Sequence, residues 1–369
     1  MIPFARVVKY GNVVEKPVGI QKAMATSTGT FVLKDNTLYY YGRNQYGEAA
    51  QGDTLAKTSW VVVSTNVDDF YAYDVGVVLH RTDGSIWSSG RCVWFNTSTI
   101  SNVLINRDTW FSSVPWDNIR NMTFTTSGTL FVVTKDNKLY AATGNGGRGV
   151  LGNGTVVSVY QLTFLLDNVQ SAIAALNDSA YLSTDGKLYS TGWNDQGIHG
   201  NGNRTQINTW KLQDSGVTHY ALSNNVFIYK NATSFRTVGN SPLFSRSTGN
   251  VYSWETVPTS VLDVNASLYF LLIPLAGTTQ SSQIVLSSTQ QLAVGSNSIN
   301  MGIGRSGTVT TPANIVLPIS VGDIKIMTIN TANSAIVSND GELYCTGTAG
   351  AFPAPTSANY YDYIKVVGP

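Results

Sequence analysis

YLSTDGKLYSTGWNDQGIHGNG, residues 181–202, is the most regular copy of a unit that recurs along the chain. Apolar residues alternate with polar ones on both sides of Asp185-Gly186, the pattern of two strands joined by a tight hairpin turn. Gly192 ends the second strand, and a loop rich in Gly and Asn follows it. A repeated unit of this kind cannot bury its apolar face alone, so its copies must stack on one another.

Seven copies of the unit fill the chain from end to end. Their turns are Asp35-Asn36, Asp83-Gly84, Asp136-Asn137, Asp185-Gly186, Asn231-Ala232, a sixth turn without Gly in IVLSSTQQLAVGSN, and Asp340-Gly341. The glycines that close the second strand of each hairpin are Gly42, Gly90, Gly144, Gly192, Gly239, Gly295 and Gly347. They are 48, 54, 48, 47, 56 and 52 residues apart, which is one period of about 51 residues.

Two further short apolar segments follow each hairpin, so each period holds about four strands, the content of one propeller blade. The expected segments include Trp60–Val63, Trp110–Val114, Tyr160–Leu165, Trp210–Leu212, Ala313–Pro318, Val169–Leu176 and Val217–Leu222. The sequence therefore predicts an all-β, seven-bladed propeller that spans residues 1–369 as a single domain. Residues 1–24 precede the first hairpin, and both Ala5–Tyr10 and Tyr360–Val367 are strand-like. We expect the ring to close by pairing of N- and C-terminal strands, with the C-terminal strand beside residues 1–31.

The repeat resembles that of the regulator-of-chromosome-condensation (RCC1) propellers. The residues that carry the resemblance are Leu188, Tyr189, Gly192, Asn194, Gly197, Gly200 and Gly202 in the fourth copy, and Leu38, Tyr39, Gly42, Asn44, Gly47 and Gly52 in the first. The fifth and sixth copies match the pattern poorly. The resemblance implies a rigid disc whose loop-lined faces bind a protein partner. It does not extend to nucleotide exchange or nucleosome binding, because the chain has no basic terminal arm and no position that matches the exchange wedge.

Composition limits the kinds of partner. Only 12% of the residues are charged and the net charge is +1, so the chain carries no electrostatic footprint for nucleic acid. The N-terminus lacks the apolar core of a signal peptide, and no apolar run is long enough to span a membrane. Cys92 and Cys345 do not form a framework of paired cysteines, and Cys345 is expected to be a small buried hydrophobe.

No pattern for catalysis, a cofactor or a metal emerges. His80, His199 and His219 lie in three different repeats, without the spacing of metal ligands, and His199 is expected in a solvated loop. No His or Cys is placed as the base of a nucleophilic triad. Residues 144–149, GNGGRG, satisfy G-x-G-x-x-G, but the fingerprint requires a following helix, and the repeat itself explains the glycines.

Aromatic residues in or beside the loops are the candidate contacts for a partner, because exposed aromatics anchor protein interfaces. With the polar side chains particular to the fourth loop, the candidate set is Tyr46, Trp94, Phe95, Trp193, Asp195, Gln196, His199 and Phe352.

The function predicted from the sequence is a non-enzymatic interaction or structural module. The charge-poor composition, rich in Ser, Thr, Asn, Gly and Tyr, resembles that of bacteriophage virion proteins made in the bacterial cytoplasm. The expected role is then a tail, baseplate or capsid-decoration component that docks on other virion proteins or on the host surface. A soluble inhibitor or effector propeller and a glycan-binding or glycan-cleaving tail protein remain alternatives.

Overall fold

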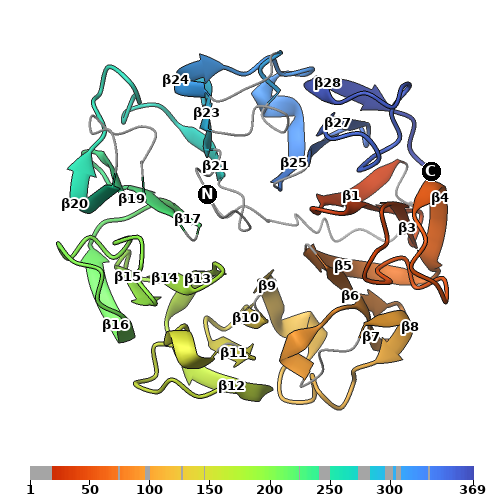
Figure 1. Cartoon of the computed structure of the whole chain (residues 1–369), viewed down its shortest axis with the longest axis horizontal. Coiled ribbons are helices and arrows are strands. Elements are labelled where there is room, and N and C mark those ends of the chain that lie inside the picture. Colours follow the sequence, from red (N-terminus) through yellow and green to blue (C-terminus); the bar gives the residue numbers. More distant parts are fainter. Residues whose placement is uncertain are drawn as a thin grey trace, which may run out of the picture.

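A computed structural model describes residues 19–73, 75–95, 100–125, 128–144, 146–223, 225–240, 250–272, 283–295, 302–304, 309–330 and 333–369. These residues form seven four-stranded antiparallel sheets, and the sheets stand around a ring as the blades of a propeller (Figure 1). Each sheet takes four consecutive strands of the chain. The predicted fold is confirmed.

The strands of blades 1–4 are β1 Ile20–Ala25, β2 Gly29–Lys34, β3 Thr37–Gly42, β4 Lys57–Ser64; β5 Val67–Tyr73, β6 Gly76–Arg81, β7 Ile86–Gly90, β8 Ser101–Asn106; β9 Ile119–Phe124, β10 Thr129–Thr134, β11 Leu139–Thr143, β12 Val159–Leu166; β13 Val169–Ala174, β14 Asp178–Ser183, β15 Leu188–Gly192, β16 Ile207–Asp214. Those of blades 5–7 are β17 His219–Leu222, β18 Val226–Lys230, β19 Phe235–Asn240, β20 Asn250–Thr256; β21 Leu268–Leu272, β22 Gln283–Ser287, β23 Gln291–Gly295, β24 Val309–Asn314; β25 Ile324–Ile329, β26 Asn333–Ser338, β27 Leu343–Gly347, β28 Tyr360–Val366. The described 3-10 helices are η1 Val93–Phe95, η2 Trp116–Asn118, η3 Gly146–Arg148 and η5 Val321–Asp323. No helix in the described ranges is long and apolar enough to cross a membrane.

The seven predicted hairpins join the second and third strands of the seven blades. In the first, Asp35 and Asn36 have φ of 50° and 58°, the left-handed pair that a type I′ turn requires. The closing glycine of the fourth, Gly192, has φ of 136°, and a Cβ there would lie 2.6 Å from the carbonyl oxygen of Asn177. Glycine at this place is therefore required by the backbone of the blade.

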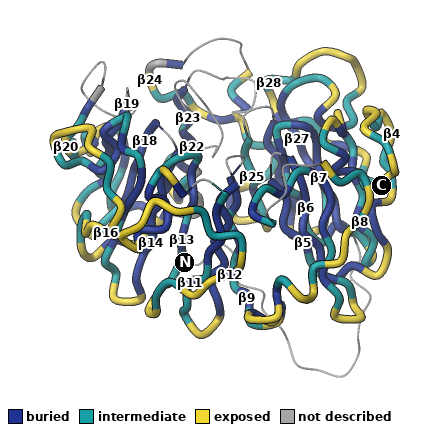
Figure 2. Tube along the Cα trace, turned by 60° about the horizontal axis from the view of Figure 1, so that its bottom comes forward, coloured by how far each residue is buried: buried dark blue, intermediate teal, exposed yellow. Residues whose placement is uncertain are grey.

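The core lies between blades. Each of the seven hydrophobic clusters joins residues of two neighbouring sheets, and one cluster sits at each blade-to-blade contact around the ring. Figure 2 shows the strands as mostly buried and the loops at both ends of the blades as exposed. Cys345 lies in the cluster between blades 7 and 1, as predicted, and both Cys92 and Cys345 are buried free thiols.

The ring closes by packing of complete blades. The two chain ends do lie side by side: Ile20 of β1 and Val366 of β28 share a cluster, and Lys34 Nζ donates to the carbonyl of Pro369. The C-terminus accordingly lies beside β4 in Figure 1. However, β1 belongs to blade 1 and β28 to blade 7, so among the described strands no sheet mixes the two ends. The described parts of the two ends are therefore side by side but not paired in one sheet, and the expected N-terminal strand Ala5–Tyr10 lies outside the described residues.

Two other predicted strands need correction. Residues 110–114 form successive turns, with Trp110 and Phe111 both bonded to the carbonyl of Arg107, and the outer strand of blade 2 is β8 instead. The reason is packing, because these turns place Phe111 and Val114 in the cluster between blades 2 and 3. Of residues 313–318, only Ala313 and Asn314 belong to a strand, β24.

Candidate interaction surface

Antiparallel order places the third-to-fourth-strand loops on the face of the ring opposite the hairpin turns, together with the first-to-second-strand loops. We call the two sides the loop face and the hairpin face. In blades 1–4 the third-to-fourth-strand loops are residues 43–56, 91–100, 144–158 and 193–206, named L1 to L4. All but one of the predicted partner contacts lie in L1, L2 and L4, so these loops are the place to look for a site.

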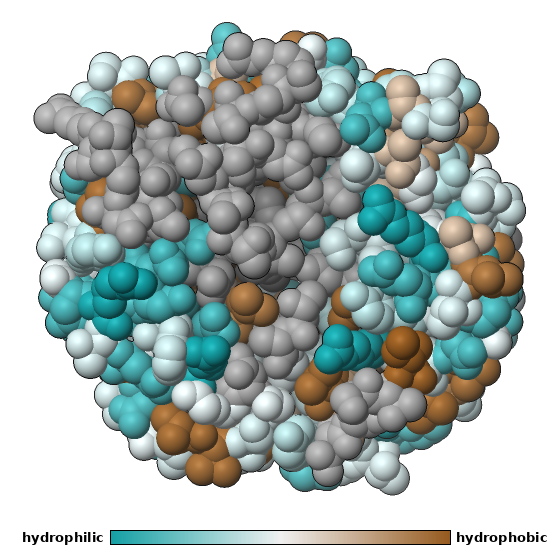
Figure 3. All heavy atoms as spheres, in the orientation of Figure 1, coloured by the Kyte–Doolittle hydropathy of each residue, from teal (hydrophilic) through white to brown (hydrophobic). Residues whose placement is uncertain are grey.

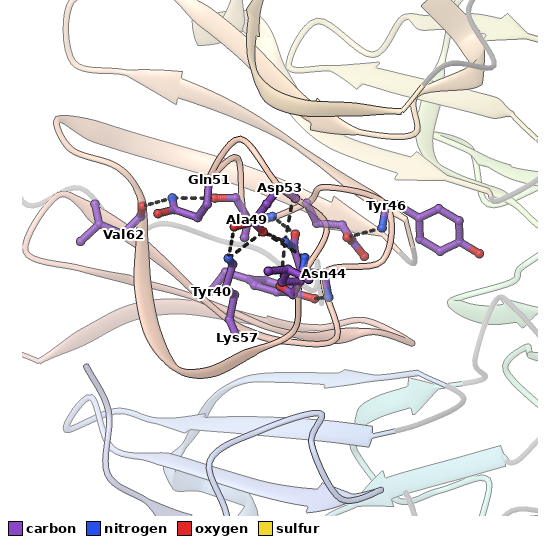
Figure 4. A network of polar contacts seen from close by, with 10 residues as sticks. Tyr40, Asn44, Tyr46, Ala49, Gln51, Asp53, Lys57 and Val62 are labelled. Atoms are coloured by element: carbon purple, nitrogen blue, oxygen red, sulfur yellow. Dashed lines mark hydrogen bonds and ion pairs between the residues drawn. The ribbon is translucent and has the colours of Figure 1, made fainter.

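A buried asparagine shapes L1 and L4 in the same way. Asn44 and Asn194 have φ of 53° and 58°, the left-handed conformation that Asn tolerates well. The Nδ2 of Asn44 donates to the carbonyls of Asp53 and Leu55, at 3.2 and 3.1 Å, and its Oδ1 accepts from the amide of Ala49 (Figure 4). Asn194 makes the same three bonds five, nine and eleven residues ahead. The Asn of the repeat therefore fixes the loop from inside.

The loops are also hydrogen-bonded to the next blade. The amides of Gly52, Gly154 and Gly202 each donate at 2.8 Å to the outer strand of the following blade, to the carbonyls of Asn102, Asn208 and Tyr252. Gly152 and Gly200 lie against the rings of Trp210 and Trp254, so close that an added Cβ would collide. L1, L3 and L4 are thus each attached to the following blade by a backbone hydrogen bond. The short 3-10 turn in L3 is not followed by a helix.

Contacts between blades also account for the tryptophans that recur at matching places in the repeat: Trp60 and Trp210 contact the preceding blade, and Trp110 contacts the following one. Trp60 Nε1 donates to the carbonyl of Val367, and Trp110 Nε1 donates to that of Tyr160.

L1 buries a carboxylate that its sister loops lack. Glu48 stands where L3 and L4 have Val150 and Ile198, and it is fully buried. It accepts hydrogen bonds from Thr28 Oγ1 at 2.7 Å and from the amide of Tyr46 at 2.9 Å. Burial raises the pKa of Glu48 above its ordinary value of about 4.5, and the two hydrogen bonds oppose that shift only in part.

The Glu48→Gln variant should be more stable than the wild type at pH 8, and the difference should vanish below about pH 4.5. The raised pKa means that ionisation of Glu48 costs stability as the pH rises from the unfolded-state value through the folded-state value. A Gln side chain keeps an acceptor for the Tyr46 amide and a donor for the Thr28 hydroxyl. The measurement is the midpoint of denaturant unfolding from pH 4 to 8.

Glu342→Gln is the matched control, because its pH dependence has the opposite sign. Lys365 and Tyr344 lower the pKa of Glu342 by hydrogen bonding, so its contribution is present at neutral pH and lost as the pH falls. The control should be less stable than the wild type at pH 8. A Glu48→Gln variant that is destabilised at pH 8 would contradict the assignment.

A Ser–His–Asp constellation that is closed to solvent lies beneath L4, with His199 in the loop, Ser190 in β15 and Asp178 in β14. His199 Nδ1 lies 2.8 Å from Ser190 Oγ, and His199 Nε2 lies 3.2 Å from Asp178 Oδ1. All three residues are at most 1% exposed. The ring nitrogens are also used in the opposite sense to a hydrolase triad, where Asp holds Nδ1 and Ser faces Nε2. His199 is therefore not a solvated loop residue, and its side chain is not exposed on the loop face as the sequence reading expected.

The constellation fills space under the loop that other blades fill differently. Blade 1 has the large side chain of Tyr40 at the place of Ser190, above Gly29. Blade 3 has Ala141 there, with Leu151 at the place of His199. The comparison identifies the buried trio as packing that is specific to blade 4.

Two of the candidate aromatics are buried, contrary to expectation. Trp94 is 0% and Phe352 1% exposed, because η1 packs Trp94 on blade 3 and Phe352 lies in the cluster that closes the ring.

The remaining candidates are half-buried. The ring of Tyr46 points away from the hydrogen-bond network of L1 in Figure 4. Phe95 is covered by the guanidinium of Arg107 at 3.9 Å and by Trp110, and Trp193 by the guanidinium of Arg148 at 4.0 Å. Asp195 and Gln196 lie beside Trp193 in L4. That these residues contact a partner stays a prediction.

Four apolar residues were missed by the sequence reading. Leu55, Ile100, Val156 and Val157, all in L1 to L3, are 70%, 41%, 49% and 63% exposed. The only sequence signal was their place in the loops between the third and fourth strands. Among the coloured residues of the face shown in Figure 3, hydrophobic groups form separate clusters between hydrophilic ones.

The other two histidines form no site. His80 stacks on Trp116, with ring centroids 5.0 Å apart, and its Nδ1 lies 3.7 Å from Asp68. Burial and the charge of Lys230 lower the pKa of His219 to about 4. Within the described ranges, no three His, Cys, Asp or Glu residues gather where they could hold a metal ion.

The arrangement matches known structures at the level of the fold. Human WBSCR16 is 14% identical, with a TM-score of 0.65 over 85% of this chain and 85% of its own. Yeast RCC1 (Prp20), bound to Kap60, is 13% identical, with a TM-score of 0.50 over 95% of this chain and 75% of its own. The fold is that of an RCC1-like propeller. Prp20p from Saccharomyces cerevisiae, described with its binding properties to Gsp1p and histones, is 14% identical, with a TM-score of 0.50 over 95% and 77% of the two chains. No family model matches the sequence, and no curated protein does.

Proposed function

We propose that this propeller is a non-enzymatic protein-interaction module that binds its partner through L1 to L4 on the loop face. The observation that carries the proposal is the exposure of apolar side chains on loops that are rigidly held. Leu55 and Val157 are 70% and 63% exposed, although L1 and L3 are fixed by hydrogen bonds to the next blade. Exposed apolar groups mark interaction sites, and a preorganised loop loses little entropy on binding.

A photo-crosslinking residue at Val157 tests the proposal in the cells that make the protein. The matched control is the same residue at Thr82, which is exposed in the hairpin between β6 and β7 on the hairpin face. We expect a discrete protein adduct from Val157 and none from Thr82. Adducts from Thr82 alone, or from neither position, would contradict the proposed surface.

The finer proposal is that the module is a bacteriophage virion component, in the tail, in the baseplate or on the capsid, that docks on other virion proteins or on the host surface. Its support is composition: 12% charged residues, with the polar surface carried by Ser, Thr, Asn and Gln. The test is sedimentation of a lysate. Comigration with assembled particles supports the virion role, whereas a free monomer favours the alternative of a soluble inhibitor or effector propeller. Release of glycan from host polysaccharide would favour the alternative of a glycan-cleaving tail protein.

A further inference from the structure

Arginine is distributed over the loop face in a regular way. L1 to L4 each carry one arginine and no lysine, namely Arg43, Arg91, Arg148 and Arg204. Arg43 and Arg91 occupy equivalent positions directly after the closing glycine, where their amides donate at 2.7 Å to the carbonyls of Thr28 and Val75. Arg43 and Arg204 are exposed, and the other two are half-buried. Four consecutive blades thus present one guanidinium each on the same face.

These guanidinium groups have no carboxylate partner among the described residues. The ion pairs that the structure does contain on the hairpin side use lysine: Lys138 with Asp136 at 2.9 Å, Lys187 with Asp185 at 2.6 Å, and Lys365 with Glu342 at 2.5 Å. Lys138, Lys187 and Lys365 on the hairpin face are therefore each neutralised by a neighbouring carboxylate. The loop face leaves its arginines available.

The acidic residues of the same loops do not offset that charge. Asp53 is paired with Lys57 at 2.8 Å, and Glu48 is buried beneath L1. Only Asp195, whose backbone carbonyl accepts from Arg204 Nε, remains as a carboxylate in L1 to L4. L1 to L4 thus carry four arginines and three carboxylates, of which one is buried and one is paired with Lys57.

We propose that the loop face of blades 1–4 docks on an acidic surface of its partner protein, whose carboxylates pair with Arg43, Arg91 and Arg204. This inference rests on the proposed function and names the chemistry of its partner. Arginine offers a planar fork that binds a carboxylate through two hydrogen bonds. Arginine and aromatic residues are enriched and lysine is depleted in protein interfaces, which is the composition of L1 to L4.

A protein partner fits these loops better than a nucleic acid. A phosphate backbone is held by many lysines and arginines along a continuous track. Here the arginines are few and stand on separate blades, and exposed Leu55, Val156 and Val157 lie among them. Apolar side chains of this kind gain nothing from phosphates but pack well on a protein surface.

The first test uses the whole chain and a fluorescent peptide of about twenty glutamates as the probe, at low salt. The triple variant Arg43→Gln, Arg91→Gln, Arg204→Gln should bind the probe about tenfold more weakly than the wild type, because it loses three solvent-exposed charge pairs that each contribute modestly. The matched control, Lys138→Gln, Lys187→Gln, Lys365→Gln, removes three cations from the hairpin face and should bind as the wild type does. Arg148 is left in place because it covers Trp193.

Three outcomes would overturn the inference: no binding of the peptide by the wild type, an equal loss in both triple variants, or tighter arginine-dependent binding of an oligothymidylate of the same length. The last would indicate a nucleic-acid partner.

The crosslinker at Val157 separates this inference from the proposed function. A lower adduct yield in the arginine variant supports both. An undiminished adduct leaves the proposed function standing and refutes the acidic partner. Absence of any adduct in the wild type refutes the proposed function, whatever the peptide does.

Discussion

The His199→Leu variant should lose about 3–5 kcal/mol of unfolding free energy, because it leaves the carboxylate of Asp178 buried without its partner. Asp178 is 0% exposed and keeps one hydrogen bond, from the amide of Asn194 at 2.9 Å. Copying blade 3 should recover more than half of the loss. The variant Asp178→Thr, Ser190→Ala, His199→Leu installs the side chains that Thr129, Ala141 and Leu151 supply there. Denaturant unfolding measures both effects.

Lys187→Ala is the control for this prediction. Lys187 and Asp185 form an ion pair of 2.6 Å in the same blade, but the side chains are 44% and 57% exposed. Exposed pairs contribute little to stability, so the control should unfold almost as the wild type does. If His199→Leu were as mild as the control, or if the blade 3 copy were less stable than the single variant, the buried pair would not be what holds L4 in place.

Removal of Tyr360–Pro369 should also lower the stability of the protein strongly and should broaden its thermal unfolding transition. This deletion removes β28, the outer strand of blade 7. Tyr363 and Val366 are 8% and 5% exposed, and they belong to the clusters that join blade 7 to blade 6 and to blade 1. Loss of two buried side chains costs about 3–6 kcal/mol, and it weakens both neighbours of the blade at once. Calorimetry gives the stability and the cooperativity of unfolding.

Removal of only Val367–Pro369 is the matched control. Val367 is 87% exposed, and the shorter deletion removes the acceptors of Trp60 Nε1 and Lys34 Nζ while it keeps β28. Two hydrogen bonds are worth about 1–3 kcal/mol, with no loss of core. Similar transitions for the longer deletion and the wild type would show that the ring does not depend on its last strand.

Much of the fold could be predicted because its signals are local. An Asp-Asn or Asp-Gly turn between alternating strands specifies a hairpin wherever it occurs, as at Asp35-Asn36, where both residues take the left-handed conformation. The period then fixes the number of blades. Residues 110–114 escaped prediction because their apolar pattern suits a strand, whereas contacts with blade 3 hold them as turns.

The candidate site was less predictable, because exposure of a loop residue depends on the blade that follows. Trp94 and Phe352 have the sequence context of exposed loop aromatics, but η1 and the closing blade bury them. His199 sits in a loop of Gly and Asn and yet points at a carboxylate that lies 21 positions earlier, in β14. No local pattern reports such a contact.

The sequence by itself determined the repeat, its hairpins, its closing glycines and the asparagines that shape L1 and L4, since each of these depends on backbone conformation within one copy. Only the tertiary structure decided how the ring closes and which side chains remain exposed, because those depend on packing between copies. It also showed that, among the described residues, the arginines of L1 to L4 have no carboxylate partner, whereas Lys138, Lys187 and Lys365 on the other face are paired. A count of charged residues along the sequence does not assign them to a face, because antiparallel strands send alternate loops to opposite sides of the ring.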